Sequence, residues 1–302
     1  MNKEVLFSII IPTYNRAELL KRCLDSVEAQ TYKNWEAIVV DNFSEDNTEE
    51  VVSSYHDQRI RYVKNHNYGI IAVSRNKALD IAKGDWLCFL DSDDQWKSSK
   101  LEILLHYVDD YDFLYHEMET NVKKTRLFQR TKSSSYDIGE MSIQEVLRRG
   151  DPVCTSCAAV SLKALGNTRF SEEKNLFAVE DYDFFLQLVD KRIRIKRIKE
   201  YLTMYDYSEG CSHGRFALDR DRQVYIKYYD RLTKEDVREI IKYYYYRKAG
   251  FFYHPGSYLT AMNYFSIAAT SKSKEVRNKG LYAMFKSFLL YILNISKEGK
   301  GI

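Results

Sequence analysis

The stretch Leu87-Cys88-Phe89-Leu90-Asp91-Ser92-Asp93-Asp94 decides the fold, because an apolar run typical of a strand ends there in three carboxylates within four residues. Carboxylates at the carboxyl end of a strand lie in the crevice where open α/β sheets bind ligands. Three of them repel one another unless a cation or hydrogen-bond donors lie nearby. Hard oxygen ligands suit Mg²⁺ or Mn²⁺, which usually also hold phosphates of the substrate. The alternative interpretation is an acidic loop that caps a helix beginning near Ser98.

Apolar runs and helical patterns alternate on the amino-terminal side of this stretch. Buried strands are predicted over residues 5–11, 35–40, 60–63 and 86–90, and helices over 16–30, 45–55 and 71–83. This alternation predicts an α/β fold with a mostly parallel sheet and helices on both faces. Further along, the pattern predicts helices over 100–108, 142–149 and 180–189, strands over 113–115 and 158–160, an antiparallel pair within 119–131, and a charged edge strand over 192–199.

Polar residues follow three of these strands at the point where each strand ends. They are Pro12-Thr13-Tyr14-Asn15-Arg16, Asp41-Asn42-Phe43-Ser44 and Asp91-Ser92-Asp93-Asp94. Because parallel strands bring their carboxyl ends to one edge of a sheet, we expect these segments to lie together. An aromatic ring, amides, a cation and carboxylates suit a nucleotide diphosphate with a metal ion. Neither G-x-x-x-x-G-K-[ST] nor G-x-G-x-x-G after the first strand is present to bind phosphates in another way.

Five segments together resemble the family 2 glycosyltransferases, which have the GT-A (Rossmann-like) fold. Residues 8–16 resemble the opening of that family, and residues 41–48 are similar to its D-D-x-S-x-D-x-T segment. Residues 74–79 resemble its A-R-N-x-G-L helix start, residues 90–94 its D-x-D strand end, and Glu180-Asp181 its E-D pair at a helix start. The segments occur in family order and cover roughly residues 5–200, which leaves the carboxyl-terminal region outside the resemblance.

The resemblance implies a donor site for a nucleotide sugar. Asp93 would bind the metal ion, Asp91 would contact the ribose and the metal, Tyr14 would lie along the base, and Arg75 would approach the sugar or phosphates of the donor. One position departs from the family: Asn42 stands where a second Asp usually reads the base. An amide both accepts and donates, so Asn42 can still pair with uracil, and a UDP-sugar is the expected donor. The expected donor site comprises Pro12, Thr13, Tyr14, Arg16, Asp41, Asn42, Arg75, Asn76, Asp91 and Ser92.

The resemblance also implies the catalytic groups. Asp181 would be the base that takes the proton of the acceptor hydroxyl, and Glu180 beside it would shape the acceptor site. Taken alone, two acidic residues at a helix start are more simply explained by the helix dipole. His213 is a third candidate metal ligand beside Asp93 and Asp91, although a lone histidine is more often structural. The metal ion itself is expected to be Mn²⁺ or Mg²⁺.

These expectations define a function and two alternatives. The function is inverting, metal-dependent transfer of a hexosyl or N-acetylhexosaminyl group from a UDP-sugar to a saccharide or lipid-linked glycan, in bacterial surface polysaccharide synthesis. The alternatives are a sugar nucleotidyltransferase, which would need a glycine-rich loop after the first strand, and a non-catalytic nucleotide-sugar-binding protein. No nucleic acid is expected as a partner. Five cysteines, an odd number, favour reduced thiols and a cytoplasmic protein, which could lie at the inner face of the plasma membrane.

We expect a GT-A domain over residues 1–214, with a nucleotide-sugar half (about 1–98) and an acceptor half (about 99–214), followed by a helical region over 215–302. That last region contains 17 Lys and Arg against 8 Asp and Glu, a net charge of +9, although the whole chain carries only +3. Its segment 281–295 is apolar on almost every face and is too short to span a bilayer. It is expected to pack on other helices, to form a contact between subunits, or to lie at a membrane surface.

Overall fold

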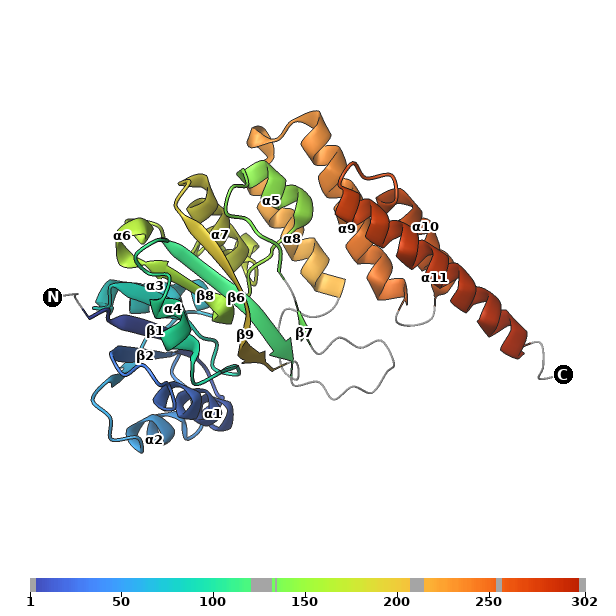
Figure 1. Cartoon of the computed structure of the whole chain (residues 1–302). Coiled ribbons are helices and arrows are strands. Elements are labelled where there is room, and N and C mark those ends of the chain that lie inside the picture. The colour runs from blue at the N-terminus through green and yellow to red at the C-terminus, as the bar shows by residue number, and fades with distance from the viewer. Residues whose placement is uncertain (1–3, 121–131, 134, 207–214, 254–256, 299–302) are drawn as a thin grey trace. The chain divides into compact units, whose positions relative to one another are not determined.

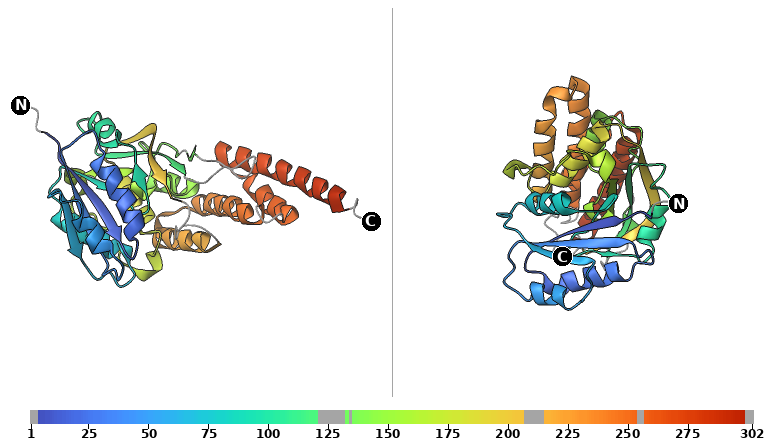
Figure 2. Two further views of the ribbon diagram at one scale, coloured as in Figure 1. Left: turned by 90° about the horizontal axis from the view of Figure 1, so that it is seen from below. Right: turned by 90° about the vertical axis from the view of Figure 1, so that its left-hand side faces the viewer.

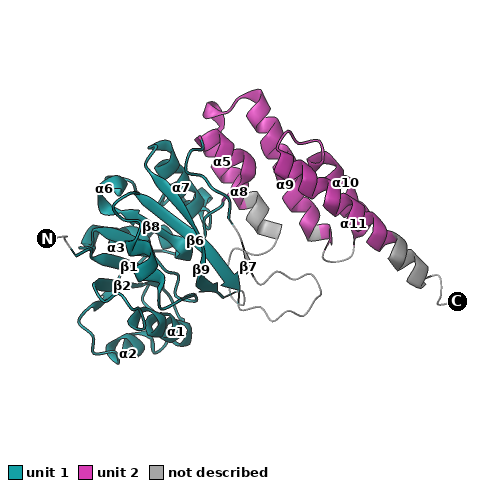
Figure 3. Cartoon of the chain, in the orientation of Figure 1, with its two compact units in different colours: residues 1–141, 152–211 teal, residues 142–151, 212–302 magenta. Residues whose placement is uncertain are grey.

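The structure is a computed structural model that describes residues 4–120, 132–133, 135–206, 215–253 and 257–298 (Figure 1). The chain forms two compact units (Figure 3). Unit 1 comprises residues 1–141 and 152–211, and unit 2 comprises residues 142–151 and 212–302. The observed division at 211/212 lies close to the boundary expected at 214/215. Residues 142–151, which we expected in the first domain, belong to unit 2.

Unit 1 is built on one mixed sheet with the strand order β3-β2-β1-β4-β8-β6-β9-β5, and β7 pairs with β6. The first four strands are parallel to one another: β1 (Phe7–Thr13), β2 (Trp35–Asp41), β3 (Ile60–Lys64) and β4 (Trp86–Phe89). The other strands are β5 (Gln95–Trp96), β6 (Phe113–Thr120), β7 (Lys132–Ser133), β8 (Ala158–Ser161) and β9 (Ile195–Tyr205). The helices are α1 (Ala17–Glu28), α2 (Thr48–Ser53), α3 (Ile71–Ile81), α4 (Lys100–Leu105), α6 (Leu162–Leu165) and α7 (Glu180–Asp190), together with short 3₁₀ turns at Thr155–Cys157 and Lys174–Leu176.

Both faces of the sheet are covered by helices (Figures 1 and 2). Ile9 and Ile11 share a buried cluster with side chains of α1, α2 and α4. On β4, Phe89 instead contacts Phe170 and Phe184 of α7, with ring centroids 5.3 and 5.6 Å apart. Because alternate residues of a strand point to opposite faces, two covered faces require a continuous apolar run, as the sequence showed. The expected fold class, a mostly parallel mixed sheet flanked by helices and followed by a helical region, is confirmed.

The last strand differs from the expected edge strand. β9 runs to Tyr205, and it pairs along its length with β6 in parallel. The short strand β5 covers its second half, with Gln95 opposite Met204 and Trp96 opposite Thr203. Only the first half of β9, where cations alternate with isoleucines, keeps the edge position among the described residues. A two-residue strand such as β5 carries no periodic signal, so the sequence did not predict this pairing. Of the antiparallel pair predicted within 119–131, β6 supplies the beginning, and residues 121–131 lie outside the described residues.

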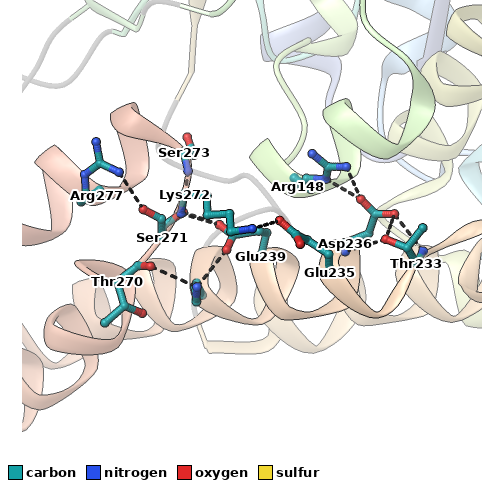
Figure 4. Close-up of polar contacts among 11 residues, drawn as sticks. Arg148, Thr233, Glu235, Asp236, Glu239, Thr270, Ser271, Lys272, Ser273 and Arg277 are labelled. Carbon is teal, nitrogen blue, oxygen red and sulfur yellow. Dashed lines mark hydrogen bonds and ion pairs between the residues drawn. The ribbon is translucent and has the colours of Figure 1, made fainter.

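Unit 2 consists of helices: α5 (Ile143–Arg149), α8 (Arg215–Lys227), α9 (Lys234–Tyr253), α10 (Tyr258–Ala268) and α11 (Lys274–Glu298), with a 3₁₀ turn at Tyr229–Arg231. Asp236 explains why α5 groups with the later helices (Figure 4). Its carboxylate accepts from the backbone and hydroxyl of Thr233 at the start of α9 and forms an ion pair with Arg148 of α5. Glu239, one turn further on, accepts from Ser271 and Lys272 before α11. Two buried acids of α9 therefore tie α5 and α11 to the same helix.

Close packing of α10 on α11 depends on a glycine. A Cβ atom on Gly280 would lie 2.9 Å from the backbone nitrogen of Ala269, a distance that requires one helix to shift. The aromatic residues of α9 pack in the same region, where the Tyr246 ring lies 5.7 Å from that of Phe265. Among the described residues, no helix has the length and apolar character needed to cross a membrane.

Candidate active site

The ends of β1, β2 and β4 lie side by side, because β1 pairs with both of the other strands. Thr13 is opposite Asp41 in the β1–β2 register, and Ile10 is opposite Phe89 in the β1–β4 register. The predicted convergence of the three polar segments at one sheet edge is therefore present in unit 1. β8 runs antiparallel to β4, so the loop that precedes β8 reaches the same edge.

Arg75 joins the two acidic motifs. Its guanidinium donates to Asp91 Oδ1 at 2.8 Å and to Glu180 Oε1 at 2.6 Å, and it lies 5.3 Å from the ring of Phe170. The residue is only 3% exposed. Burial raises the pKa of the Glu180 carboxyl and Asp181 adds to this effect, whereas Arg75 opposes it. This contact places the start of α7 beside the end of β4, although 105 residues separate Arg75 from Glu180.

Asp93 and Asp94 are the more buried carboxylates of the D-x-D stretch. Arg16 donates to Asp93 Oδ2 at 2.8 Å, and the backbone N–H of Asp206 donates to Asp94 Oδ1 at 2.9 Å. Desolvation, followed by the charge of Asp91, raises the pKa of both carboxyl groups. Asp94 Oδ2 is buried without a hydrogen-bond partner in the described part of the chain. Arg16 therefore does not fully compensate the carboxylates of this stretch.

These residues suit a divalent cation only in part. Among the described residues, no group of three or more His, Cys, Asp or Glu side chains is arranged to hold a metal ion. Mg²⁺ and Mn²⁺ commonly use one or two carboxylates and take their remaining ligands from water and substrate phosphates. The carboxylate oxygens of Asp91 and Asp93 fit that arrangement, and Asp94 Oδ2, which is buried without a hydrogen-bond partner among the described residues, would be stabilised by such a cation. His213, the third expected ligand, lies outside the described residues.

Asp181 is half-buried at the start of α7, and both of its carboxylate oxygens are held. The hydroxyl of Thr155 donates to Oδ2 at 2.6 Å, and the backbone N–H of Tyr182 donates to Oδ1 at 2.8 Å. These two donors fix the orientation of the carboxylate. Thr155 was not predicted as a site residue. The available signal was its position just before an antiparallel strand, whose first residues must lie at the carboxyl edge of the parallel strands.

Ser156 is a second residue that the sequence did not reveal. Its carbonyl oxygen accepts from Trp96 Nε1, Lys100 Nζ and Thr203 Oγ1 at 2.9–3.0 Å. Its hydroxyl oxygen accepts the backbone N–H of Asp91 at 3.0 Å. The loop that orients Asp181 is therefore fixed to the stretch that carries Asp91.

The expected base-binding residues gather at the end of β2. The Asp41 carboxylate is fully buried and accepts from the hydroxyl of Tyr62 at 2.6 Å and from the backbone of Ser44. Asn42 Oδ1 accepts the backbone N–H of Asn67 at 2.8 Å, which leaves Nδ2 as the donating end of the amide. The buried Asp41 thus fixes the loop that follows β2, while the Asn42 amide can still donate to a ligand through Nδ2.

Exposed aromatic rings lie next to Asn42 in the chain and in the loop that binds it. Phe43 has a positive φ of 57° and stacks on His66, with ring centroids 3.7 Å apart and 10° between the planes. Tyr14 is half-exposed after β1, and Tyr68 is 85% exposed. The sequence predicted Tyr14 but not the Phe43–His66 stack, because its two rings come from different loops.

The remaining expected residues divide into two groups. Pro12, Thr13 and Ser92 are buried at the strand ends, and Thr13 Oγ1 has no hydrogen-bond partner among the described residues. Asn76 is instead engaged by its own chain. Its side chain exchanges hydrogen bonds with the backbone of Phe170 and donates to Glu172. Asn76 therefore fixes the backbone of Phe170, whose ring contacts Arg75.

Comparison with known proteins identifies relatives. The family described as "Glycosyl transferase family 2" matches residues 8–167. The Escherichia coli protein named "UDP-Glc:alpha-D-GlcNAc-diphosphoundecaprenol beta-1,3-glucosyltransferase WfaP" is 29% identical over 205 residues, which cover 68% of this chain and 78% of the relative. Four further curated relatives are matched over only 35–50% of their own length.

Two solved structures have a similar fold. One is Staphylococcus aureus TarS 1–349 in complex with UDP, with a TM-score of 0.59, 20% identity, and coverage of 98% of this chain and 92% of that one. The other is the mannosyltransferase PcManGT from Pyrobaculum calidifontis in complex with GDP-Man and Mn²⁺, with a TM-score of 0.55, 18% identity, and coverage of 96% and 82%. At these identities the likeness shows the fold, which is the GT-A fold of glycosyltransferases.

Proposed function

Because this chain belongs to glycosyl transferase family 2 and is a glycosyltransferase, we propose that it transfers a sugar from a UDP-sugar to an acceptor hydroxyl with inversion and with the help of a divalent metal ion. The observation that carries this proposal is the Arg75 bridge. It joins Asp91, on the donor side, to Glu180, whose neighbour Asp181 is the one carboxylate of the pair that remains half-exposed.

The proposed reaction is a single displacement. Asp181 takes the proton of the acceptor hydroxyl as that oxygen forms a bond to the anomeric carbon of the donor sugar. The bond between this carbon and the diphosphate oxygen breaks, and the diphosphate leaves with the electron pair. One displacement inverts the configuration. Thr155 and the Tyr182 backbone keep the accepting carboxylate in one orientation, so it is positioned before the acceptor arrives.

Charge balance at the leaving group is the second requirement. Asp91 and Asp93 would hold the metal ion, which neutralises charge on the departing diphosphate. Arg16 lies within reach of Asp93 and supplies a cation at the same edge. A UDP-sugar agrees with the side-chain amide of Asn42, whose Nδ2 has no hydrogen-bond acceptor among the described residues and can donate to a uracil carbonyl. It also agrees with the UDP complex of TarS, and the Mn²⁺ complex of PcManGT supports the metal ion.

We further propose that the acceptor is a saccharide or a lipid-linked glycan, within bacterial surface polysaccharide synthesis. The support is the name of the E. coli relative, which specifies a GlcNAc-diphosphoundecaprenol acceptor. The glucose named there is one candidate for the transferred sugar. The acidic start of α7 agrees with an acceptor that presents hydroxyl groups.

The test uses the purified full chain and a panel of UDP-Glc, UDP-GlcNAc and GDP-Man, with nucleotide diphosphate release as the readout. UDP release should require Mn²⁺ or Mg²⁺ and should stop with EDTA. Asp93→Asn should lower the rate of UDP release by about 10²-fold or more, because metal stabilisation of a leaving group contributes several kcal/mol. The matched control is Asp80→Asn, which alters an exposed acid of α3 that pairs with Arg169. Equal release in EDTA, or an active Asp93→Asn enzyme, would reject the metal-dependent mechanism.

A further inference from the structure

Over residues 274–291, where its side chains are described, helix α11 packs on its neighbours with one side. Val276, Gly280 and Ser287 are buried on that side, and Met284 packs against a cluster that contains Ala261 and Phe265. These positions recur every three to four residues, as a single helix face requires. Since this face satisfies the packing of unit 2, the remaining apolar residues of α11 need another explanation.

A row of large apolar side chains lies on the other side of α11, and we call it the α11 stripe. It consists of Leu281, Tyr282, Phe285, Phe288 and Leu289, which are 46, 67, 60, 45 and 44% exposed. Their spacing places them on one face over about two turns. Contiguous exposed apolar residues of this kind mark an interaction surface, whereas single exposed ones do not. The stripe is therefore a candidate contact surface of unit 2.

The charge around the stripe indicates the kind of partner. At 100° per residue, Lys279 and Lys286 occupy helix positions along one side of the stripe together with Glu275, which forms an ion pair with Lys279, and Arg277 lies on the other side. The three cations exceed the one acid, so the flanks of the stripe keep a net positive charge. Residues 257–302 contain seven Lys and Arg but only two Glu. A second copy docked through the same stripe would bring these cations together, and their repulsion would oppose association. An anionic surface would be attracted by the same cations.

We propose that the α11 stripe binds the surface of an anionic lipid bilayer, with α11 lying in the plane of the interface. Phenylalanine and leucine side chains would enter the boundary between headgroups and acyl chains, Tyr282 would remain at headgroup level, and the flanking cations would contact anionic headgroups. This attachment is peripheral and reversible. The proposal does not depend on the reaction that the enzyme performs.

The test is vesicle flotation with the full chain and no sugar donor. Vesicles of phosphatidylcholine alone are compared with vesicles that also contain phosphatidylglycerol. Salt is raised from about 0.1 M to about 1 M, which shortens the Debye length from about 10 Å to about 3 Å. We expect binding to the anionic vesicles only, and most of it should be lost at the higher salt.

Two variants and one control locate the surface. Phe285→Glu/Phe288→Glu should weaken binding about tenfold or more, and Tyr282→Glu alone should weaken it less, since binding scales with the apolar area buried. Tyr229→Glu is the matched control for Tyr282→Glu: this tyrosine is also in unit 2, is 62% exposed and receives the same change of charge, but it lies in the 3₁₀ turn before α9. It should bind like the unaltered chain. The altered side chains are exposed, so circular dichroism should show unchanged helix content.

Three outcomes would overturn the proposal. One is no binding to anionic vesicles at low salt. Another is binding that the double variant leaves unchanged. The third is a dimer in sedimentation velocity that the double variant dissociates, without vesicle binding, which would make the stripe a contact between two copies. Each outcome leaves sugar transfer in solution as a separate question, so the proposed function can stand when this inference fails.

Discussion

Replacing Arg75 with methionine should destabilise unit 1 strongly. Arg75 is the buried cation between Asp91 and Glu180, at 2.8 and 2.6 Å, and its side chain is 4% exposed. Methionine fills a similar volume without charge, so the change removes the cation and keeps most of the packing. What remains is a buried Glu180 whose Oε2 already lacks a partner among the described residues.

The size of the effect follows from the uncompensated acid. Removing one partner of a buried ion pair costs about 3–5 kcal/mol, compared with about 5–15 kcal/mol for the total stability of a domain. At a urea dependence of about 2 kcal/mol per molar, the midpoint of unfolding should fall by about 2 M. Arg75→Met combined with Glu180→Gln removes the stranded charge as well. The double variant should therefore recover more than about 1 kcal/mol relative to Arg75→Met.

The chain offers a convenient probe and a matched control for this measurement. All three tryptophans, Trp35, Trp86 and Trp96, are buried in unit 1, so their fluorescence in urea reports the unfolding of that unit. The control is Arg194→Met, which breaks an exposed ion pair with Asp112 and should leave the midpoint nearly unchanged. The reasoning fails if Arg75→Met shifts the midpoint no more than the control does, or if adding Glu180→Gln lowers it further.

Three other predictions concern single residues. Asp181→Asn should cut turnover by about 10²–10⁴ and leave UDP binding by calorimetry unchanged; loss of UDP binding would instead place Asp181 in the donor site. Asn42→Asp should strengthen UDP binding by about tenfold or more, because a carboxylate accepts a charge-assisted hydrogen bond from uracil N3–H, worth about 1.5 kcal/mol or more; an equal gain for GDP would contradict this. Lys100 is fully buried, and desolvation lowers its pKa to about 8. Between pH 8 and about 10.4 the unfolded chain then holds more protons, so the free energy of unfolding should rise with pH by about 3 kcal/mol relative to Lys100→Met; parallel stability profiles of the two proteins would refute the shift.

The sequence predicted the parts of unit 1 that depend on local pattern. Strands buried on both faces gave continuous apolar runs, and the parallel direction of β1, β2 and β4 followed from the helices between them. The convergence of Thr13, Asp41 and Asp91 at one edge is a consequence of that shared direction. These predictions succeeded because each depends on the spacing of apolar residues or on how a helix connects two strands. Both can be recognised within a short segment of sequence.

The contacts that define the site were not predictable in the same way. Nothing near Arg75 in the sequence indicates that its partner is Glu180, and nothing near Asp181 indicates Thr155. The second pair depends on β8 reversing direction beside β4, which brings the 154–157 loop to the sheet edge. Likewise, the assignment of α5 to unit 2 depends on the pairing of Arg148 with Asp236, which lies 88 residues further along the chain.

Arg75 joins the two acidic motifs that form the proposed site. Asp91 and Asp181 belong to segments that a short charged loop and a helix start would each explain adequately. The buried guanidinium of Arg75 makes the separate explanations insufficient, because a cation is buried at this depth only when carboxylates from both segments compensate it. The loop must therefore meet the helix start for unit 1 to be stable, and this requirement holds the donor side and the proposed base in a fixed relation. Stability and the proposed chemistry thus depend on the same arginine, so Arg75→Lys should reduce both, since a lysine cannot donate from a planar fork to two carboxylates at once.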